Sequence, residues 1–317
     1  MKLLDAPNWS LLTPTNIRAR NLWPWAHSIQ KLVHSGEPHP RECHDLLILS
    51  DFGGEHKKAT HNIYCFLVLK RGAAKFIREV RRLREEHLPN SRTMAYKALG
   101  DRKRQEAIVN FLEIASDLDG HLVAVAIDKR KKWLSTGPNS HTVIRDYWQL
   151  QSSWNARSLE AMMRKIHMVV ALLPLWSEPF GNVTWITDQD EFVGNDRRHD
   201  DALAVVSKFS KLYLQHSMGK FALHTTSQDK DGKDFEDLCS VPDLAAGMIS
   251  EVAAQLTADG TWEDRIRRVV QTDLPTKAQL LADWFWDGGM RLRKTMISLD
   301  VVGDQYGLRK VWMEQDQ

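Results

Sequence analysis

The chain has 317 residues, of which 43% are hydrophobic and 26% are charged, and its formal net charge at pH 7 is +2. These values are ordinary for a globular protein, and the charge balance identifies no partner by itself. Three widely spaced cysteines argue against a disulfide framework or a thiolate metal site. Since no apolar run approaches the roughly 18 residues of a membrane span and the start lacks a signal peptide's apolar core, we expect a cytoplasmic protein without a membrane partner.

Three parts are distinguished by composition. Residues 1–44 hold five prolines and three tryptophans, a content that excludes a long helix and predicts an N-terminal wrap with one short helix. Residues 45–256 carry regular apolar patterns and predict one domain. Residues 257–317, with four tryptophans, are expected to form a C-terminal helical extension.

The middle part alternates apolar runs of strand length with segments of helical spacing. In chain order we expect strands at 45–50 and 62–69, a helix at 73–87, a strand at 121–128, a helix at 155–173, a strand at 182–188, a helix at 200–216, a strand at 220–226 and a helix at 241–256 with Pro242 in its first turn. A hairpin followed by helical crossovers predicts an α/β protein whose mixed sheet is covered by helices on both faces.

Aspartates stand at the ends of three of these apolar runs. They are Asp51, Asp128 and Asp188, and a fourth, Asp243, lies near the start of the last helix of the domain. Sites in such sheets form beyond the carboxyl ends of the strands, so the four side chains are expected to converge. Clustered carboxylates repel one another and suit Mg²⁺ or Mn²⁺. Two such ions, about 4 Å apart, can hold the attacking water and the leaving oxygen of a phosphoryl transfer.

A purely structural interpretation of each aspartate stays open. Asp51 can simply open the hairpin turn, because aspartate is common directly after a strand, and the same holds for Asp128 and Asp188. Asp243 can serve as a first-turn carboxylate that interacts with the helix dipole.

Several short motifs resemble those of the domain-of-unknown-function 3800 family. They are "LLILSDFGG", "NIYCFLVL", "MAYKALGD", "VAVAIDK", "WITDQDE" and "VPDLAAGMI", and together they span roughly residues 45–256. The resemblance implies a ribonuclease H-like fold, with metal-binding acids on the first strand, the central fourth strand and the last helix. On this chain it implies Asp51, Asp128 and Asp243, with Asp188 as a fourth member and Asp190 or Glu191 as adjacent substitutes. It also implies a role for Lys97, in "AYKAL".

Basic residues accompany the proposed acids. Lys129, Arg130, Lys131 and Lys132 directly follow Asp128, and a second basic run extends over 70–104. Cations beside a metal site are what binding of a phosphate backbone requires, although a solvated helix face gives the same pattern. Glu55, His56 and Asp190 are candidate accessory groups, and turn formation explains the first two better than a functional role does.

The sequence therefore predicts a Mg²⁺- or Mn²⁺-dependent nuclease, or a related phosphoryl-transfer enzyme, that acts on DNA or RNA. Lys97 and the cluster Lys129–Lys132 are expected to position the nucleic acid. The alternative is a non-catalytic ribonuclease H-like interaction protein, for example a subunit of a defence or mobile-element complex, whose tryptophan-rich ends bind a protein partner or a second copy.

Overall fold

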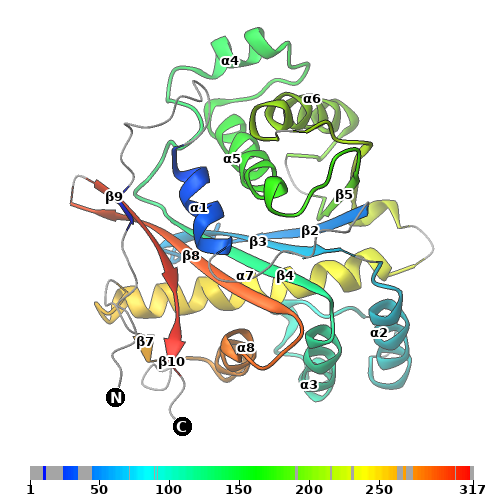
Figure 1. Cartoon of the computed structure of the whole chain (residues 1–317). Helices are drawn as coiled ribbons and strands as arrows, with labels where there is room; N and C mark the ends of the chain where they lie inside the picture. Colours follow the sequence, from blue (N-terminus) through cyan, green and yellow to red (C-terminus); the bar gives the residue numbers. More distant parts are fainter. Residues whose placement is uncertain are drawn as a thin grey trace.

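A computed structural model of the chain is built around an eight-stranded mixed sheet (Figure 1). The structure describes residues 10–11, 24–34, 45–70, 72–88, 90, 92–189, 192–214, 216–229, 232–262, 267–268, 274–303 and 305–314. From edge to edge the strands are β1 (Ser10–Leu11), β9 (Gln305–Val311), β8 (Arg293–Val302), β4 (Gly120–Asp128), β3 (His61–Leu69), β2 (Asp45–Gly53), β5 (Asn182–Thr187) and β6 (Phe221–Thr225). A separate parallel pair joins β7 (Arg267–Arg268) and β10 (Met313–Glu314).

Strand directions determine which strand ends lie together. β3 is antiparallel to both β2 and β4, so these two strands run the same way. β5 is parallel to β2, β6 is parallel to β5, and β8 is parallel to β4. The carboxyl ends of these five strands therefore lie at one edge of the sheet.

Helices cover both faces of the sheet (Figure 1). Their bounds are α1 (Pro24–His34), α2 (Ala74–His87), α3 (Arg102–Ser116), α4 (His141–Trp148), α5 (Ala156–Leu172), α6 (Asp196–Tyr213), α7 (Asp234–Ala258) and α8 (Thr276–Trp286), with short 3₁₀ turns η3 (Tyr96–Ala98), η4 (Leu173–Leu175) and η5 (Thr226–Gln228). α2, α3, α7 and α8 pack on one face, and α1, α5 and α6 pack on the other. The predicted α/β mixed sheet with helices on both faces is confirmed.

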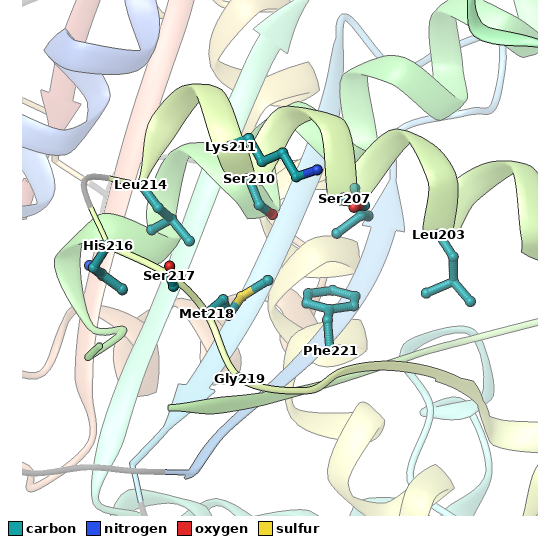
Figure 2. A pocket seen from close by; sticks show the side chains of 11 residues that line it. Leu203, Ser207, Ser210, Lys211, Leu214, His216, Ser217, Met218, Gly219 and Phe221 are labelled. Carbon is teal, nitrogen blue, oxygen red and sulfur yellow. The ribbon is translucent and has the colours of Figure 1, made fainter. Parts of the chain in front are cut away.

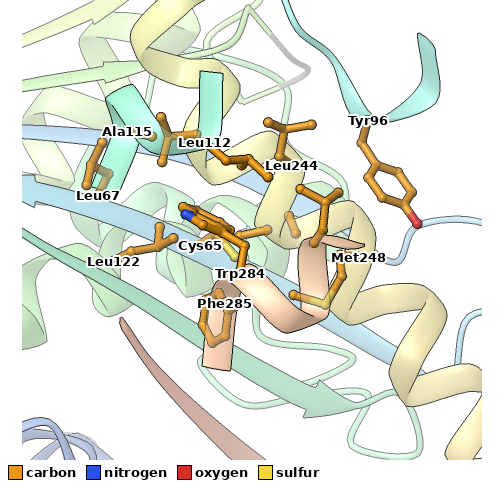
Figure 3. Packing of buried hydrophobic residues seen from close by; sticks show 14 of the residues in the cluster. Cys65, Leu67, Tyr96, Leu112, Ala115, Leu122, Leu244, Met248, Trp284 and Phe285 are labelled. Carbon is orange, nitrogen blue, oxygen red and sulfur yellow. The ribbon is translucent and has the colours of Figure 1, made fainter. Parts of the chain in front are cut away.

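The apolar strands are buried on both sides, as their continuous apolar runs predict. In β4, Leu122 and Ala124 belong to the core beneath α7, whereas Val123 and Val125 belong to the core beneath α5. Figure 3 shows the first of these cores, where Leu244 of α7 and Trp284 of α8 lie near the strands. Burial on this scale fixes the strand register, because a slip of one residue would exchange the two faces.

The last long helix begins earlier than the sequence predicts. α7 starts at Asp234, seven residues before the expected start, and Pro242 lies in its interior. Acidic side chains in its first turn interact favourably with the helix dipole. Leu238, Val241 and Leu244 are all buried around the proline, so their packing offsets the backbone hydrogen bond that Pro242 cannot donate.

The expected helical extension at the C-terminus is wrong in large part. After the end of α7 at Ala258, α8 is the only α-helix among the described residues, and Arg293–Val302 and Gln305–Val311 instead form β8 and β9, which extend the sheet beyond β4. β-branched residues such as Thr295, Ile297 and Val301 favour these strands. Much of the "TWEDRIRRVVQ" segment, also expected to be helical, lies outside the described residues.

The tryptophans near the two ends of the chain mostly belong to the core. Trp25, Trp262 and Trp284 are each less than 7% exposed, whereas Trp312 is 59% exposed. Trp9 and Trp23 lie outside the described residues. Of the helices that the structure describes, none has the length and apolarity needed to cross a membrane.

Candidate active site

Asp51 is part of a strand rather than the start of a turn. β2 continues two residues past it to Gly53, and Asp51 pairs with Cys65 of β3. Leu49, two residues earlier, lies in the core beneath α7, so the alternation of side chains directs Asp51 to the same face. Gly53 allows α7 to approach, because a Cβ there would lie 2.9 Å from the carbonyl oxygen of Ala246. The interpretation of Asp51 as a turn opener is therefore wrong.

Asp243 lies near the middle of α7, opposite this part of β2. Since the helix starts at Asp234, Asp243 is not the first-turn carboxylate considered above, and the helix dipole does not explain it. Its Oδ2 accepts a hydrogen bond of 2.7 Å from the backbone N–H of Tyr96 in η3. The Tyr96 ring packs against Gly247, where a Cβ would lie only 2.2 Å from ring atoms. The contact with Gly247 thus positions Tyr96 and its N–H beside Asp243.

Asp188 follows β5 directly and is next in register to Asp51. Ser50 pairs with Thr187 in the parallel β2–β5 ladder, so the two aspartates are the next residues on neighbouring strands. The hydroxyl of Thr226, which begins η5 after β6, donates a hydrogen bond of 2.6 Å to Asp188 Oδ1. The carboxyl ends of β2, β5 and β6 thus meet at this point, as predicted.

A cavity of about 670 Å³ brings the three aspartates together. Its polar and charged lining includes Asp51, Asp188, Asp243, Glu55, His56, Thr93, Lys97, Thr226, Glu236, Ser240, Ser250, Glu251 and Lys277. Lys97 is exposed at its edge, and Lys277 lies 3.3 Å from Glu251 with its ammonium 4.1 Å from the Tyr96 ring centroid. The site therefore combines an acidic centre with cations at its border.

The electrostatics of the cavity favour a bound cation. Burial raises the pKa of Asp51 well above its ordinary value, and the charges of Asp243 and Asp188 raise it further. Burial also raises the pKa of Asp243, while the Tyr96 N–H and Lys97 oppose that rise. Carboxylates that are desolvated and repel one another are stabilised when a cation is shared among them.

The side chains that could bind a metal suit a hard divalent ion, although they stand too far apart to hold one as they are. Three aspartate carboxylates offer the oxygen ligands that Mg²⁺ and Mn²⁺ prefer. Among the described residues, no three histidine, cysteine, aspartate or glutamate side chains stand close enough together to hold a metal as they are. Binding an ion would therefore have to draw these carboxylates closer to one another.

Asp128 does not join the other aspartates. It ends β4 on the same face and edge as Asp51, but β3 separates the two strands. Its carboxylate accepts hydrogen bonds from Arg130 Nε at 2.8 Å and from the backbone N–H of Val301 at 3.3 Å, and it does not line the cavity. The expected convergence of Asp51, Asp128 and Asp243 is wrong for Asp128, which is a buried partner of Arg130.

The accessory residues are divided between the cavity and its surroundings. Glu55 and His56 both line the cavity, and His56 Nε2 lies 3.5 Å from the Ser250 hydroxyl. Asp190 and Glu191 lie outside the described residues.

The basic cluster Lys129–Lys132 is adjacent to the site rather than inside it. Lys129 Nζ donates a hydrogen bond of 2.8 Å to the carbonyl of His56. Arg130 pairs with Asp128, and the Lys131 ammonium lies 4.0 Å from the Tyr306 ring centroid. Lys132 is exposed. The four cations thus have different neighbours, and none of them lines the cavity. Lys97 is the predicted cation that does.

A larger cavity, of about 760 Å³, lies elsewhere. Figure 2 shows it between the end of α6 and the start of β6, with Ser210, Lys211 and His216 in its wall. Its described lining residues include no carboxylate. It also lies at the amino end of β6, away from the strand ends where the aspartates meet. Size alone therefore does not identify the site.

Sequence reasoning missed a polar stripe on α7. Glu236, Ser240, Asp243, Gly247 and Ser250 follow one another at steps of four, three, four and three residues, which places them on one helix face. All five line the cavity. The stripe is visible in the sequence once the helix is extended to Asp234. Tyr96 and Lys277 belong to other segments, and no comparable periodicity identifies them.

Replacing Gly247 with Ala should disturb this site despite the higher helix propensity of Ala, worth about 1 kcal/mol. The new methyl group would displace the Tyr96 ring, and we expect the free energy of unfolding to fall by about 1–3 kcal/mol. The Tyr96 N–H would move away from Asp243, so divalent-metal binding should weaken as well. Denaturant unfolding and Mn²⁺ titration measure both effects. Gly100→Ala is the control, because a Cβ there meets no atom within 4 Å.

Comparisons of the chain with families of known proteins, with curated protein sequences and with solved structures find no match. The resemblance to the domain-of-unknown-function 3800 family therefore stays a prediction.

Proposed function

We propose that the protein is a divalent-metal-dependent nuclease, or a related phosphoryl-transfer enzyme, acting on nucleic acid. The observation that carries this proposal is the meeting of Asp51, Asp188 and Asp243 in one cavity bordered by Lys97 and Lys277. The three acids come from β2, from the end of β5 and from α7. Counted from β2, β5 is the fourth strand in the chain, so this distribution supports the ribonuclease H-like resemblance with Asp188, not Asp128, as the central acid.

The chain's own residues have distinct roles in this proposal. Asp51, Asp188 and Asp243 would hold Mg²⁺ or Mn²⁺, two ions being the expectation for this chemistry. When bound, the metal supplies charge stabilisation for in-line displacement at phosphorus. The Tyr96 N–H and the Thr226 hydroxyl orient two of the carboxylates. Lys97 and Lys277 neutralise phosphates of the substrate backbone at the border of the cavity.

The direct test incubates purified protein with labelled single- and double-stranded DNA, RNA and DNA–RNA hybrid, with Mn²⁺, Mg²⁺ or EDTA. We expect cleavage of at least one substrate that requires the divalent ion, together with a Mn²⁺-dependent rise in Tm. At a hundred times its Kd, a ligand that binds only the folded state stabilises it by about 2.7 kcal/mol. No cleavage and no shift in Tm would contradict the proposal.

The alternative of a non-catalytic interaction protein receives less support. It assigns partner binding to the tryptophan-rich ends, yet Trp25, Trp262 and Trp284 are buried in the core. We also propose a reducing, cytoplasmic location, with which the free and buried Cys65 and Cys239 are consistent.

The basic cluster remains a predicted contributor to nucleic-acid binding. Replacing Lys129, Lys131 and Lys132 together with Ala should weaken binding to every sequence alike. The slope of log K against log salt should flatten by about two to three units if each cation meets a phosphate. Arg130 is left intact because it pairs with the buried Asp128.

A matched control removes three exposed cations at the opposite edge of the sheet. Lys31, Lys211 and Lys220 are exposed. Lys211 lies at the end of α6 and Lys220 just before β6, and Lys31 follows Gln30, which donates a hydrogen bond to the carbonyl of Ala171 at the end of α5. If both triple variants lose affinity and slope equally in a salt titration by fluorescence anisotropy, the cluster has no specific role.

A further inference from the structure

A further cavity, of about 450 Å³, lies at the opposite edge of the sheet from the aspartates. Arg293 and Lys294, at the start of β8, border it, as do Val311 and Trp312, at the end of β9 and just beyond it. β8 runs in the same direction as β4 and β2, so its start is far from the strand end that carries Asp51. The cavity is therefore separate from the candidate active site, and neither the proposed catalysis nor the predicted motifs account for it.

The charges around this cavity favour an anion. Its cationic lining residues are Arg291, Arg293, Lys294 and Lys310, and Asp287 is the one carboxylate among the described residues of its wall. Lys294 is partly buried, with its ammonium donating a 2.6 Å hydrogen bond to the carbonyl of Trp284. Burial lowers the pKa of Lys294 to about 8, so it is still a cation at neutral pH. A nearby anion would stabilise a cation in this position.

Aromatic groups stand beside these cations. Trp312 is 59% exposed, and the Lys310 ammonium lies 4.3 Å from its ring centroid. Trp286 also lines the cavity, and its indole N–H is buried without a hydrogen-bond partner in the described part of the chain. The wall thus offers a flat ring and several cations.

We propose that this cavity binds a nucleotide unit, with its phosphate beside Arg291 and Arg293 and its base stacked on Trp312. Cations neutralise phosphate, and every base presents a face that stacks on an aromatic ring. The volume lies within the range of about 300–1,000 Å³ that is usual for small-molecule sites. A free nucleotide and a segment of single-stranded nucleic acid share this chemistry. The inference goes beyond the proposed nuclease function and requires neither the aspartates nor a metal.

The test measures fluorescence anisotropy of a short labelled oligothymidylate with the full-length protein in EDTA. Without metal, the carboxylates of the candidate active site repel phosphate and contribute little to binding. Trp312→Ala should weaken binding by about fivefold to a hundredfold, the usual effect of losing a base stack. Arg293→Ala should weaken binding and flatten the salt slope by about 0.7.

Tyr147→Ala is the matched control, because Tyr147 is an aromatic residue of α4 that is 81% exposed. It should bind the oligonucleotide as the unaltered protein does. Competition with thymidine monophosphate distinguishes the two ligands. If thymidine monophosphate displaces the oligonucleotide at concentrations near the Kd of the oligonucleotide, the cavity binds a free nucleotide. If it does not displace the oligonucleotide, the cavity binds a strand.

Two results would overturn the proposal. One is that Trp312→Ala and Tyr147→Ala bind the oligonucleotide equally well. The other is that poly-glutamate competes for the cavity with a dependence on Arg293 but not on Trp312, which would identify a site for acidic peptides. Circular dichroism of each variant shows whether it is folded before binding is compared.

Discussion

Replacing Asp51 with Asn is expected to reduce divalent-metal-dependent cleavage by more than about a hundredfold. Loss of a residue that merely supports a metal ligand already costs about 10–100-fold, so loss of a ligand should cost more. Stability should respond differently. Because Asp243 and Asp188 repel the Asp51 carboxylate, Asn at this position should leave the metal-free Tm unchanged or higher. Cleavage assays and thermal unfolding in EDTA measure the two effects.

The effect of Asp51 on stability should also depend on pH. Since its folded-state pKa is raised, ionisation costs stability as pH rises from the ordinary value of 3.8 through the folded-state pKa. The metal-free protein should lose stability over this rise, and Asp51→Asn should reduce that loss.

Asp128→Asn is the matched control, with the same change at the same edge of the sheet. Asp128 is 4% exposed and pairs with Arg130, so its replacement should lower stability and leave cleavage per folded molecule intact. If instead Asp128→Asn abolishes cleavage and Asp51→Asn does not, the site lies elsewhere.

Asp237 should also make the stability of the protein depend on pH. This residue is fully buried in α7, and its Oδ2 lies 2.9 Å from Arg84 Nε of α2. Burial raises the pKa of Asp237 from 3.8 to about 7, because desolvation outweighs the attraction of Arg84. Folding therefore favours the protonated carboxyl, and the associated stability is lost as pH rises from about 4 through 7.

Asp237→Asn should remove this dependence. The free energy of unfolding of the variant, relative to the unaltered protein, should rise by roughly 3 kcal/mol between pH 5 and pH 8. Asp237→Asn also deprives Arg84 of its ionic partner, which lowers stability. The comparison across pH separates this loss from the effect of ionising the Asp237 carboxyl. Urea unfolding at several pH values measures the difference, and parallel curves would contradict the assignment. Asp119→Asn is the control, because the Arg291–Asp119 pair lies on the surface, where an ion pair contributes little to stability, and because Asp119 is not one of the charges that shift the pKa of Asp237.

The strand pattern was sufficient to predict much of the site. Asp51 and Asp188 end apolar runs, and parallel neighbours carry such residues to the same edge. The pattern could not exclude Asp128. It predicts that a residue lies at the carboxyl edge of the sheet, but not where along that edge the residue lies. The lateral distance depends on strand order, and the insertion of β3 between β2 and β4 is a long-range property of the fold.

The helix that carries Asp243 illustrates a different limit. Local propensity predicts that a proline begins a helix, and tertiary packing around Pro242 overrides that preference. The same limit applies at the C-terminus, where "DWFWDGGMRLRK" has a helical start, and the glycine pair Gly288–Gly289 then separates α8 from a strand. Composition could not predict that these last strands would join the central sheet.

The order in which the sheet closes has a consequence for synthesis in the cell. β4 leaves the ribosome long before its neighbour β8, because 165 residues separate Asp128 from Arg293. At about 5–20 residues per second, translation of that interval takes roughly ten to thirty seconds. During this time β4, which is apolar along most of its length, has one unpaired edge that can pair with another nascent chain. We therefore expect slow translation to favour aggregation, and chaperones that shield this strand to raise the yield of folded protein.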